Sequence, residues 1–310
     1  MGRVIYDEDL VNGFIQDCRL RKFTKHTIQS YQSVLRSFIS FLSRKGKGIL
    51  DVDRNTFKEY IAYLFDKKYS YKTVENHFSA LSTFYDYLVY EGFMEKNYVL
   101  EIRKRYLRHY KKDVRVNQRK LIGIEEMAHF INSIMDIRDK AIALLFAKTG
   151  IRRKELIALD VDDVDLDNLT LRLKPTAKRS NRIVFIDYET ASVLRKWLEV
   201  RKSIAKCNAL FVSYETGQRL KRRGVYDAIT KWAKRAGLHN PSSKKLEDHF
   251  TPHCFRHWFT TWLLRNGMPR EYVKELRGDA RKEAMDLYYH IDLEELKKAY
   301  LSCIPKLGVA

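Results

Sequence analysis

PHCFRHWFTTWLL, residues 252–264, combines apolar positions at helical spacing with two polar side chains that suit a phosphate. His253 and Arg256 are three residues apart, so they share one face of a helix expected over residues 253–266. A guanidinium can donate two hydrogen bonds at once to phosphate oxygens. The segment therefore predicts a helical domain that binds a phosphodiester.

A second arginine is expected at the start of another helix, in TGIRRKEL at residues 149–156. Gly150 is typical of a helix C-terminus, which places Arg152 where the next helix begins. Two arginines at one phosphodiester would stabilise the negative charge that develops in a pentacoordinate transition state. Tyr288 is the candidate nucleophile, and its ordinary pKa of about 10 means that it needs a base or a cationic field.

The same chemistry predicts that no metal and no cofactor are needed. A covalent phosphotyrosine keeps the energy of the broken backbone bond, so rejoining needs no ATP, and the sequence has no P-loop. It also has no cluster of acidic or Cys and His residues at metal-ligand spacing. The four cysteines form no CxxC pair, which argues against zinc and against a disulfide framework.

The charge of the chain predicts a polyanionic partner. There are 59 Lys and Arg residues against 39 Asp and Glu residues, a formal net charge of +20. Residues 1–120 and the remainder each carry half of this excess, so both parts suit contact with nucleic acid. No apolar run is long enough for a signal peptide or a membrane span, and an intracellular setting is expected.

We expect a mainly α fold (α+β) with two domains. Residues 1–98 read as a helical domain, with Thr24 or Thr27 capping one helix, Thr73 capping another and Gly92 as a stop. Residues 99–121 read as a basic linker that follows DNA phosphates or, alternatively, as a solvated connector. Its candidate DNA-binding residues are Arg103, Lys104, Arg105, Arg108, Lys111 and Lys112.

Residues 122–310 form the second predicted domain. Residues 125–148 read as helical, and residues 161–186 alternate apolar and polar positions as a small antiparallel sheet does. Asp167 and Asn168 indicate a turn between two of its strands. Helices are then expected at about 188–204, 223–236, 253–266, 269–277 and 281–290.

The ordered set resembles the tyrosine recombinase and integrase family, which includes lambda integrase and the Xer recombinases. TGIRRKELIAL is similar to the first-arginine box, PHCFRHWFTTWLL to the HxxR box, and RGDARKEAMDLYYHID to the nucleophile box, the last resembling archaeal integrase-like members most. The resemblance covers nearly the whole chain. It implies an N-terminal SAM-like core-binding domain, a basic linker and a catalytic domain with a C-terminal tail helix.

The resemblance also implies a role for each candidate residue. Arg152 and Arg256 would hold the scissile phosphate, with Glu155 orienting Arg152, and His253 would assist proton transfer. Tyr288 would attack, leaving a 3′-phosphotyrosyl bond and a free 5′-hydroxyl. His257 is expected to be packed rather than catalytic.

Three assignments stay open at this point. The family's lysine, which protonates the leaving oxygen from a β-hairpin, matches Lys178, with Lys174 as the alternative. Asp279 stands where the family usually has a second histidine or tryptophan, and it either takes the proton from Tyr288 or fixes a catalytic arginine. The amphipathic tail after Asp292 packs either onto a neighbouring subunit, as in the family, or onto its own domain.

The predicted function is site-specific recombination or integration of DNA. The expected partners are duplex DNA with an inverted-repeat core site and further copies of the chain, as a dimer or tetramer on DNA. The expected location is the cytoplasm at the nucleoid, with a viral or plasmid gene as one source. The alternatives are a type IB topoisomerase-like enzyme and a DNA-binding accessory protein whose active site has decayed.

Overall fold

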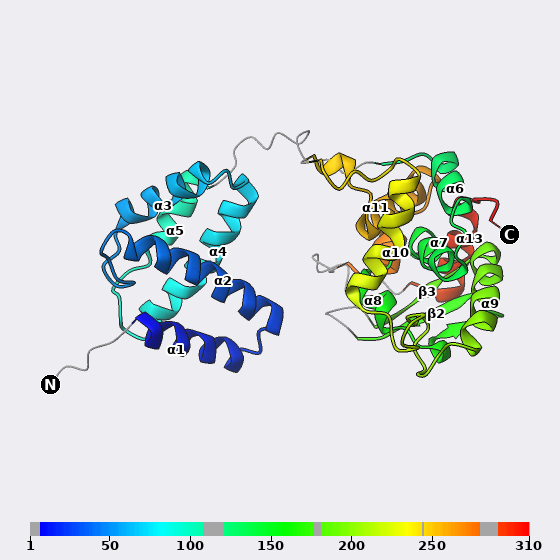
Figure 1. Cartoon of the computed structure of the whole chain (residues 1–310), viewed down its shortest axis with the longest axis horizontal. Helices are drawn as coiled ribbons and strands as arrows, with labels where there is room; N and C mark the ends of the chain where they lie inside the picture. The colour runs from blue at the N-terminus through cyan, green and yellow to red at the C-terminus, as the bar shows by residue number, and fades with distance from the viewer. Residues whose placement is uncertain (1–6, 108–120, 176–180, 244, 280–290, 310) are drawn as a thin grey trace. The chain divides into compact units, whose positions relative to one another are not determined.

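The computed structural model describes residues 7–107, 121–175, 181–243, 245–279 and 291–309. The chain divides into two compact units, Met1–Lys112 and Asp113–Ala310. Figure 1 shows the first unit as helices only and the second as helices around a small sheet. This arrangement confirms the predicted mainly α class with a minor β component.

Among its described residues, the first unit has five helices around one hydrophobic core. They are α1 (Asp7–Leu20), α2 (Lys25–Ser43), α3 (Arg54–Asp66), α4 (Tyr71–Tyr90) and α5 (Tyr98–Tyr106). Thr24 caps α2 as predicted, because its side chain accepts a hydrogen bond from the backbone of Thr27. The predicted cap at Thr73 is wrong: Ser70 caps α4, and Thr73 donates its backbone N–H to it.

Helix α5 changes the predicted start of the linker. The segment from residue 99 was expected to connect the domains, but Val99, Ile102 and Leu107 are buried in the core of the first unit. Asn97 caps the helix by accepting the backbone N–H of Val99. The sequence did not indicate this helix, because its last turn carries basic side chains and only one side of it is apolar.

The second unit surrounds a helix that is buried on nearly every side. Helix α7 (Ile137–Thr149) packs against α6 (Ile124–Asn132), α9 (Tyr188–Lys202), α10 (Arg222–Arg235) and α11 (Pro252–Arg265). Such a helix belongs in the centre of a domain, since it has no polar face to offer solvent. The helix predicted across residues 125–148 is thus two helices, separated by residues 133–136.

The sheet has three antiparallel strands in the order β1 (Val164–Asp165), β2 (Thr170–Leu173) and β3 (Arg182–Phe185). Leu171 pairs with Val184, and Leu173 pairs with Arg182. The turn between β1 and β2 holds Asn168, whose backbone N–H donates to Asp165 at 2.8 Å. This confirms the predicted sheet and turn.

The last helices of the chain pack within the second unit. Helix α8 (Arg153–Ala158) follows α7, α12 (Arg270–Arg277) follows α11, and α13 (Leu293–Cys303) packs its buried residues Leu296 and Tyr300 into a cluster with Phe259 of α11. In this single-chain structure the described part of the tail packs onto its own domain, which is one of the two expected arrangements.

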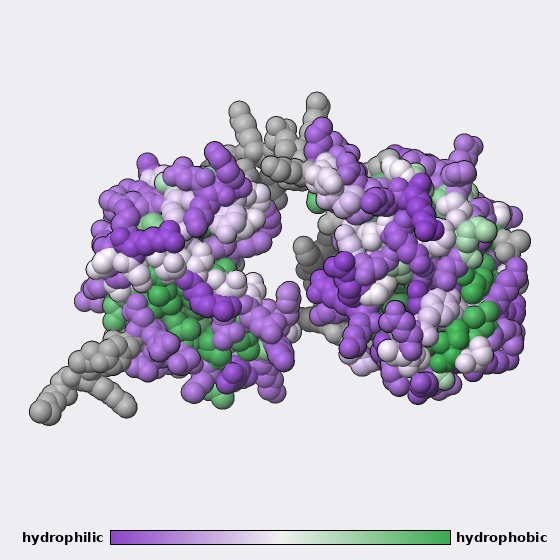
Figure 2. All heavy atoms as spheres, viewed as in Figure 1, coloured by the Kyte–Doolittle hydropathy of each residue, from purple (hydrophilic) through white to green (hydrophobic). Residues whose placement is uncertain are grey.

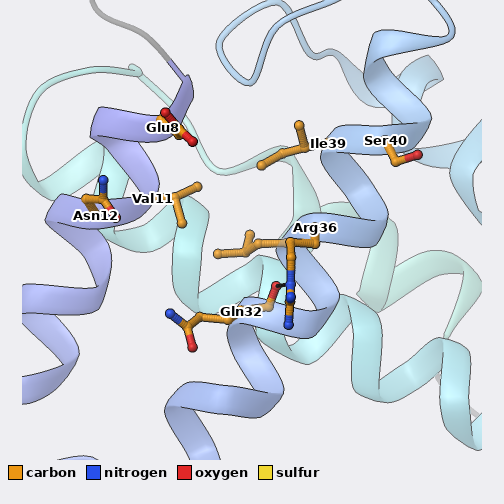
Figure 3. A pocket seen from close by; sticks show the side chains of 8 residues that line it. Glu8, Val11, Asn12, Gln32, Arg36, Ile39 and Ser40 are labelled. Atoms are coloured by element: carbon orange, nitrogen blue, oxygen red, sulfur yellow. Dashed lines mark hydrogen bonds between the residues drawn. The ribbon is translucent and has the colours of Figure 1, made fainter.

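A pocket of about 530 Å³ lies between α1 and α2 of the first unit. Val11 and Ile39 face each other across it, and Arg36 and Gln32 border it on α2 (Figure 3). Figure 2 shows hydrophobic side chains gathered over this part of the first unit, while hydrophilic ones cover most of the visible face. None of the predicted catalytic residues lines this pocket.

Candidate active site

The end of α7 and the middle of α11 are in close contact at Gly150. This residue ends α7 in the left-handed conformation, with φ at 59°. A Cβ atom there would lie 2.4 Å from Cδ1 of Phe259, which is closer than real atoms approach. A glycine is therefore required, both for its backbone and for the space that Phe259 occupies.

Arg256 is held by backbone and carboxylate oxygens from two other segments. Its Nη1 donates to the carbonyl of Gly150 at 2.8 Å, and its Nη2 donates to the carbonyl of Arg277 at 2.8 Å and to Oδ1 of Asp279 at 3.0 Å. Only 6% of the residue is exposed. Burial, with Arg152 and Arg277 nearby, lowers the pKa of Arg256 to about 10, so the guanidinium stays charged at neutral pH.

Arg152, which follows Gly150 by two residues, contacts the same segment at the end of α12 that Arg256 contacts. Its Nη2 donates to the carbonyl of Gly278 at 3.4 Å and lies 3.7 Å from Oδ1 of Asp279. Its side chain is 40% exposed, unlike the buried Arg256. The structure thus brings together Arg152, Arg256 and Asp279, as the sequence predicted, at the C-terminal end of α12.

Glu155 is a buried carboxylate between two arginines. It accepts the backbone N–H of Arg152 at 2.6 Å and the Nη1 of Arg152 at 3.1 Å. It also accepts the Nη1 of Arg182 at 2.9 Å. Burial would raise the pKa of Glu155, but the hydrogen bonds and charges of Arg182 and Arg152 outweigh it and the pKa lies below its usual range.

Arg182 was missed by the sequence analysis. It opens β3, its side chain is 6% exposed, and its Nε donates to the carbonyl of Leu276 at 2.8 Å. The available signal was its place at the start of a β-prone run that follows Lys178, where an alternating pattern turns every second side chain inward. The charge of the residue suggested a surface position instead.

His253 lies in the first turn of α11, one turn before Arg256, and is exposed. Its ring meets that of His257 edge-on, with centroids 5.0 Å apart. His257 is exposed as well, so the prediction that it is packed is wrong. It follows His253 by four residues on the polar side of α11, whose opposite side holds the buried Trp258 and Phe259.

Of the two candidates for the catalytic lysine, Lys174 and Lys178, the structure describes only Lys174. Lys174 forms ion pairs with Asp160 and, at 3.1 Å, with Asp163. The hydrogen bond that Lys174 donates to Asp160, together with the charge of Asp163, raises the pKa of Lys174 against the effect of burial. An ammonium held in this way is a weaker proton donor, which favours Lys178. Lys178 and Tyr288 both lie outside the described residues.

The structure describes only some of the predicted DNA-binding residues. Lys104 and Arg105 are exposed on α5, and Arg103 on the same helix is half-buried. Arg108, Lys111 and Lys112 lie outside the described residues.

The described part of the chain lacks the features of two other kinds of site. Among those residues, no group of three or more His, Cys, Asp or Glu side chains is placed to hold a metal ion. Within the same ranges, no helix has the length and apolar character to cross a membrane.

Comparison with known proteins places the chain in a family. Residues 122–295 match the phage integrase family, and residues 10–93 match its N-terminal SAM-like domain. The first match alone spans more than half of the 310 residues. The chain belongs to the phage integrase family.

Curated relatives refine this class. The chain is 28% identical over 295 residues to tyrosine recombinase XerC of Alcanivorax borkumensis, covering 92% of this chain and 90% of that protein. It is 26% identical over 312 residues to tyrosine recombinase XerD of Listeria monocytogenes, covering 96% and 99%. The chain is thus an enzyme of the tyrosine recombinase type, a site-specific recombinase that breaks and rejoins DNA. These relatives do not favour the topoisomerase alternative.

Solved structures share the fold. The Tn1549 transposon integrase in complex with circular intermediate DNA matches with a TM-score of 0.72 at 20% identity, covering 94% of this chain and 98% of that one. A lambda integrase dimer bound to a COC′ core site matches with a TM-score of 0.66 at 16% identity, covering 92% and 79%.

Proposed function

We propose that this recombinase cleaves one strand of duplex DNA at a specific site by attack of the Tyr288 oxygen on the scissile phosphorus. The bond from that oxygen to phosphorus forms, and the bond from phosphorus to the 5′-oxygen breaks. The hydroxyl proton of Tyr288 passes to His253, the 5′-oxygen takes a proton from Lys178, and rejoining reverses these steps. The reaction needs neither ATP nor a metal ion.

The observation that carries this proposal is the convergence of Arg152 and Arg256 on the Gly278–Asp279 loop. The guanidinium groups of Arg152 and Arg256 differ in exposure and belong to different helices. They meet at Asp279, nine residues before Tyr288 in the sequence. Fixed cations aimed at a phosphate stabilise the charge that its non-bridging oxygens gain in the transition state. Exposed His253, one helical turn from Arg256, is the group that assists proton transfer at the same phosphate.

The partners follow from the same proposal. The DNA carries two inverted half-sites, each bound by one copy of the chain, and two such dimers form the tetramer that exchanges strands. Relatives solved with DNA include XerH on its difH substrate and the lambda integrase dimer on a core site. The exposed basic residues of α5 contact DNA phosphates, which position a protein on the duplex without reading its sequence. The protein acts in the cytoplasm, on chromosomal, viral or plasmid DNA.

A covalent trap tests the reaction. The protein is mixed with sheared DNA from its host, denatured in SDS, and the DNA that remains attached is sequenced. We expect adducts at one short inverted-repeat sequence, and none with Tyr288→Phe. Tyr188→Phe, at a tyrosine that is 76% exposed on α9, is the matched control and should form adducts normally.

Two outcomes would overturn the proposal. Adducts scattered over many sequences would contradict the site-specific reaction and indicate relaxation of DNA. Tight DNA binding without any adduct would indicate the decayed accessory protein.

A further inference from the structure

Arg182 links three parts of the active-site region without being exposed to a substrate. It opens β3, four residues after Lys178, and only 6% of its side chain is exposed. Its Nη1 and Nη2 donate to the two carboxylate oxygens of Glu155 at 2.9 and 3.4 Å. Its Nε donates to the carbonyl of Leu276 near the end of α12 at 2.8 Å.

We infer that Arg182 is a positioning residue for DNA cleavage, which compensates the charge of Glu155 so that Glu155 orients Arg152 without cancelling its positive charge. This inference rests on the proposed function, in which Arg152 holds the scissile phosphate. It assigns Arg182 no contact with DNA.

The charges of the cluster support this role. A carboxylate paired with one guanidinium gives a neutral pair, whose field at a nearby phosphate is weak compared with that of a free cation. Glu155 is 1% exposed and sits between two guanidiniums, so the three groups together keep one positive charge. The buried Arg182 balances the carboxylate, and the 40% exposed Arg152 presents the remaining charge.

The geometry gives Arg182 a second effect through α12. The carbonyl of Leu276, which it binds, directly precedes Arg277, whose carbonyl binds Arg256. The next carbonyl, that of Gly278, meets Arg152. Arg182 thus fixes the end of α12, from which both phosphate-binding arginines take backbone contacts.

A merely structural ion pair would stabilise the domain and do nothing more, and the test must separate the two roles. The variants are Arg182→Gln, which removes the charge, and Arg182→Lys, which keeps it. Arg138→Gln is the matched control, because Arg138 is 9% exposed and pairs with the buried Asp139 at the opposite end of α7. DNA affinity and melting temperature are measured for each.

The substrate is a nicked duplex with the sequence recovered by covalent trapping, and the measured quantity is the first-order rate of adduct formation at saturating protein. A second duplex carries a methylphosphonate at the scissile position. There a methyl group replaces one non-bridging oxygen and removes the negative charge, so a weakened cation matters less.

We expect Arg182→Gln to slow cleavage of the phosphate by about tenfold or more, in the range seen when transition-state charge stabilisation is weakened. The loss should shrink on the methylphosphonate, and DNA affinity should change little. Arg182→Lys should fold and retain most of the rate. Arg138→Gln should lower the melting temperature without slowing cleavage.

Equal losses for Arg182→Gln on both duplexes, or a wild-type rate on both, would overturn the inference while leaving the proposed function intact. If Arg182→Gln does not fold, a folded Arg182→Lys that loses the same factor on both duplexes would also overturn it. An adduct that persists in Tyr288→Phe would instead refute the proposed function itself, and the role of Arg182 with it.

Discussion

The Nη2 nitrogen of Arg256 lies 3.0 Å from the Oδ1 oxygen of Asp279, and this contact gives the carboxylate a defined place in the site. The other oxygen of Asp279 lies 3.0 Å from the Nε of Arg277, and Arg152 is 3.7 Å from Oδ1. One carboxylate thus faces three guanidiniums. Of the two roles that the sequence left open for Asp279, this geometry favours fixing the arginines.

Replacing Asp279 distinguishes these roles. An amide oxygen still accepts a hydrogen bond from Arg256, but an amide cannot take a proton from Tyr288. If Asp279 fixes the arginines, Asp279→Asn should cleave DNA much faster than Asp279→Ala, which leaves the guanidinium of Arg256 without that acceptor. The single-turnover rate of adduct formation measures this. Equal and severe losses in both variants would support the role as a base.

The leaving group identifies the lysine. Lys178→Ala should slow cleavage strongly on ordinary DNA and recover on a duplex whose leaving 5′-oxygen is replaced by sulfur, because a thiol has a pKa of about 8.5 and leaves without a proton donor. Lys174→Ala should cleave both duplexes like the wild type, since its ammonium is bound to Asp160 and Asp163. Recovery of Lys174→Ala by sulfur would reverse the assignment.

The site was predictable where sequence spacing fixes geometry. Gly150 followed by Arg152, and His253 followed by Arg256, carry their own local structure, because a glycine cap and a three-residue helical spacing are short-range features. The same holds for the helical pattern of the first unit and for the turn at Asn168.

Long-range pairing could not be read in this way. Arg182 meets Glu155 across 27 residues, and Lys148 meets Asp187 across 39. In both pairs the charged side chains occupy positions that the sequence pattern assigns to the surface. The burial of both partners becomes evident only in the complete fold. Helix α5 was missed for a related reason, since a basic stretch follows its two buried residues, Val99 and Ile102.

Gly150 provides a test of the contact between α7 and α11. Gly150→Ala should lower both stability and cleavage, because its Cβ would lie 2.4 Å from Phe259 and must displace that ring, which belongs to the same helix as Arg256. Gly237→Ala is the control, with a similar φ of 70° and no atom within 4 Å of the added Cβ. It should lose only the roughly 1–2 kcal/mol that a left-handed backbone costs alanine. Thermal unfolding and adduct formation report both effects, and equal melting temperatures would contradict the close packing.

The C-terminal tail is held by a buried charge cluster, and this makes its cis placement testable. Lys148 is fully buried and donates to Asp187 at 2.5 Å, to Glu189, and to the carbonyl of Pro305 at 2.7 Å. Glu189 in turn accepts the backbone N–H groups of Leu307 and Gly308. The cluster thus connects the middle of the domain to its last residues.

Removing the ammonium group of Lys148 should therefore destabilise the domain and not the tail alone. Lys148→Met leaves two partly buried carboxylates without their cation, and breaking a buried pair in this way costs about 3–5 kcal/mol. Lys202→Met is the control: its pairing with Glu199 is exposed, and such pairs contribute about 0–1 kcal/mol. Denaturant unfolding of the free protein, at a concentration where it is monomeric, measures both. Because the contacts lie within one chain, the loss should be independent of protein concentration. A loss that appears only when copies of the chain associate would show that the tail of one copy binds another.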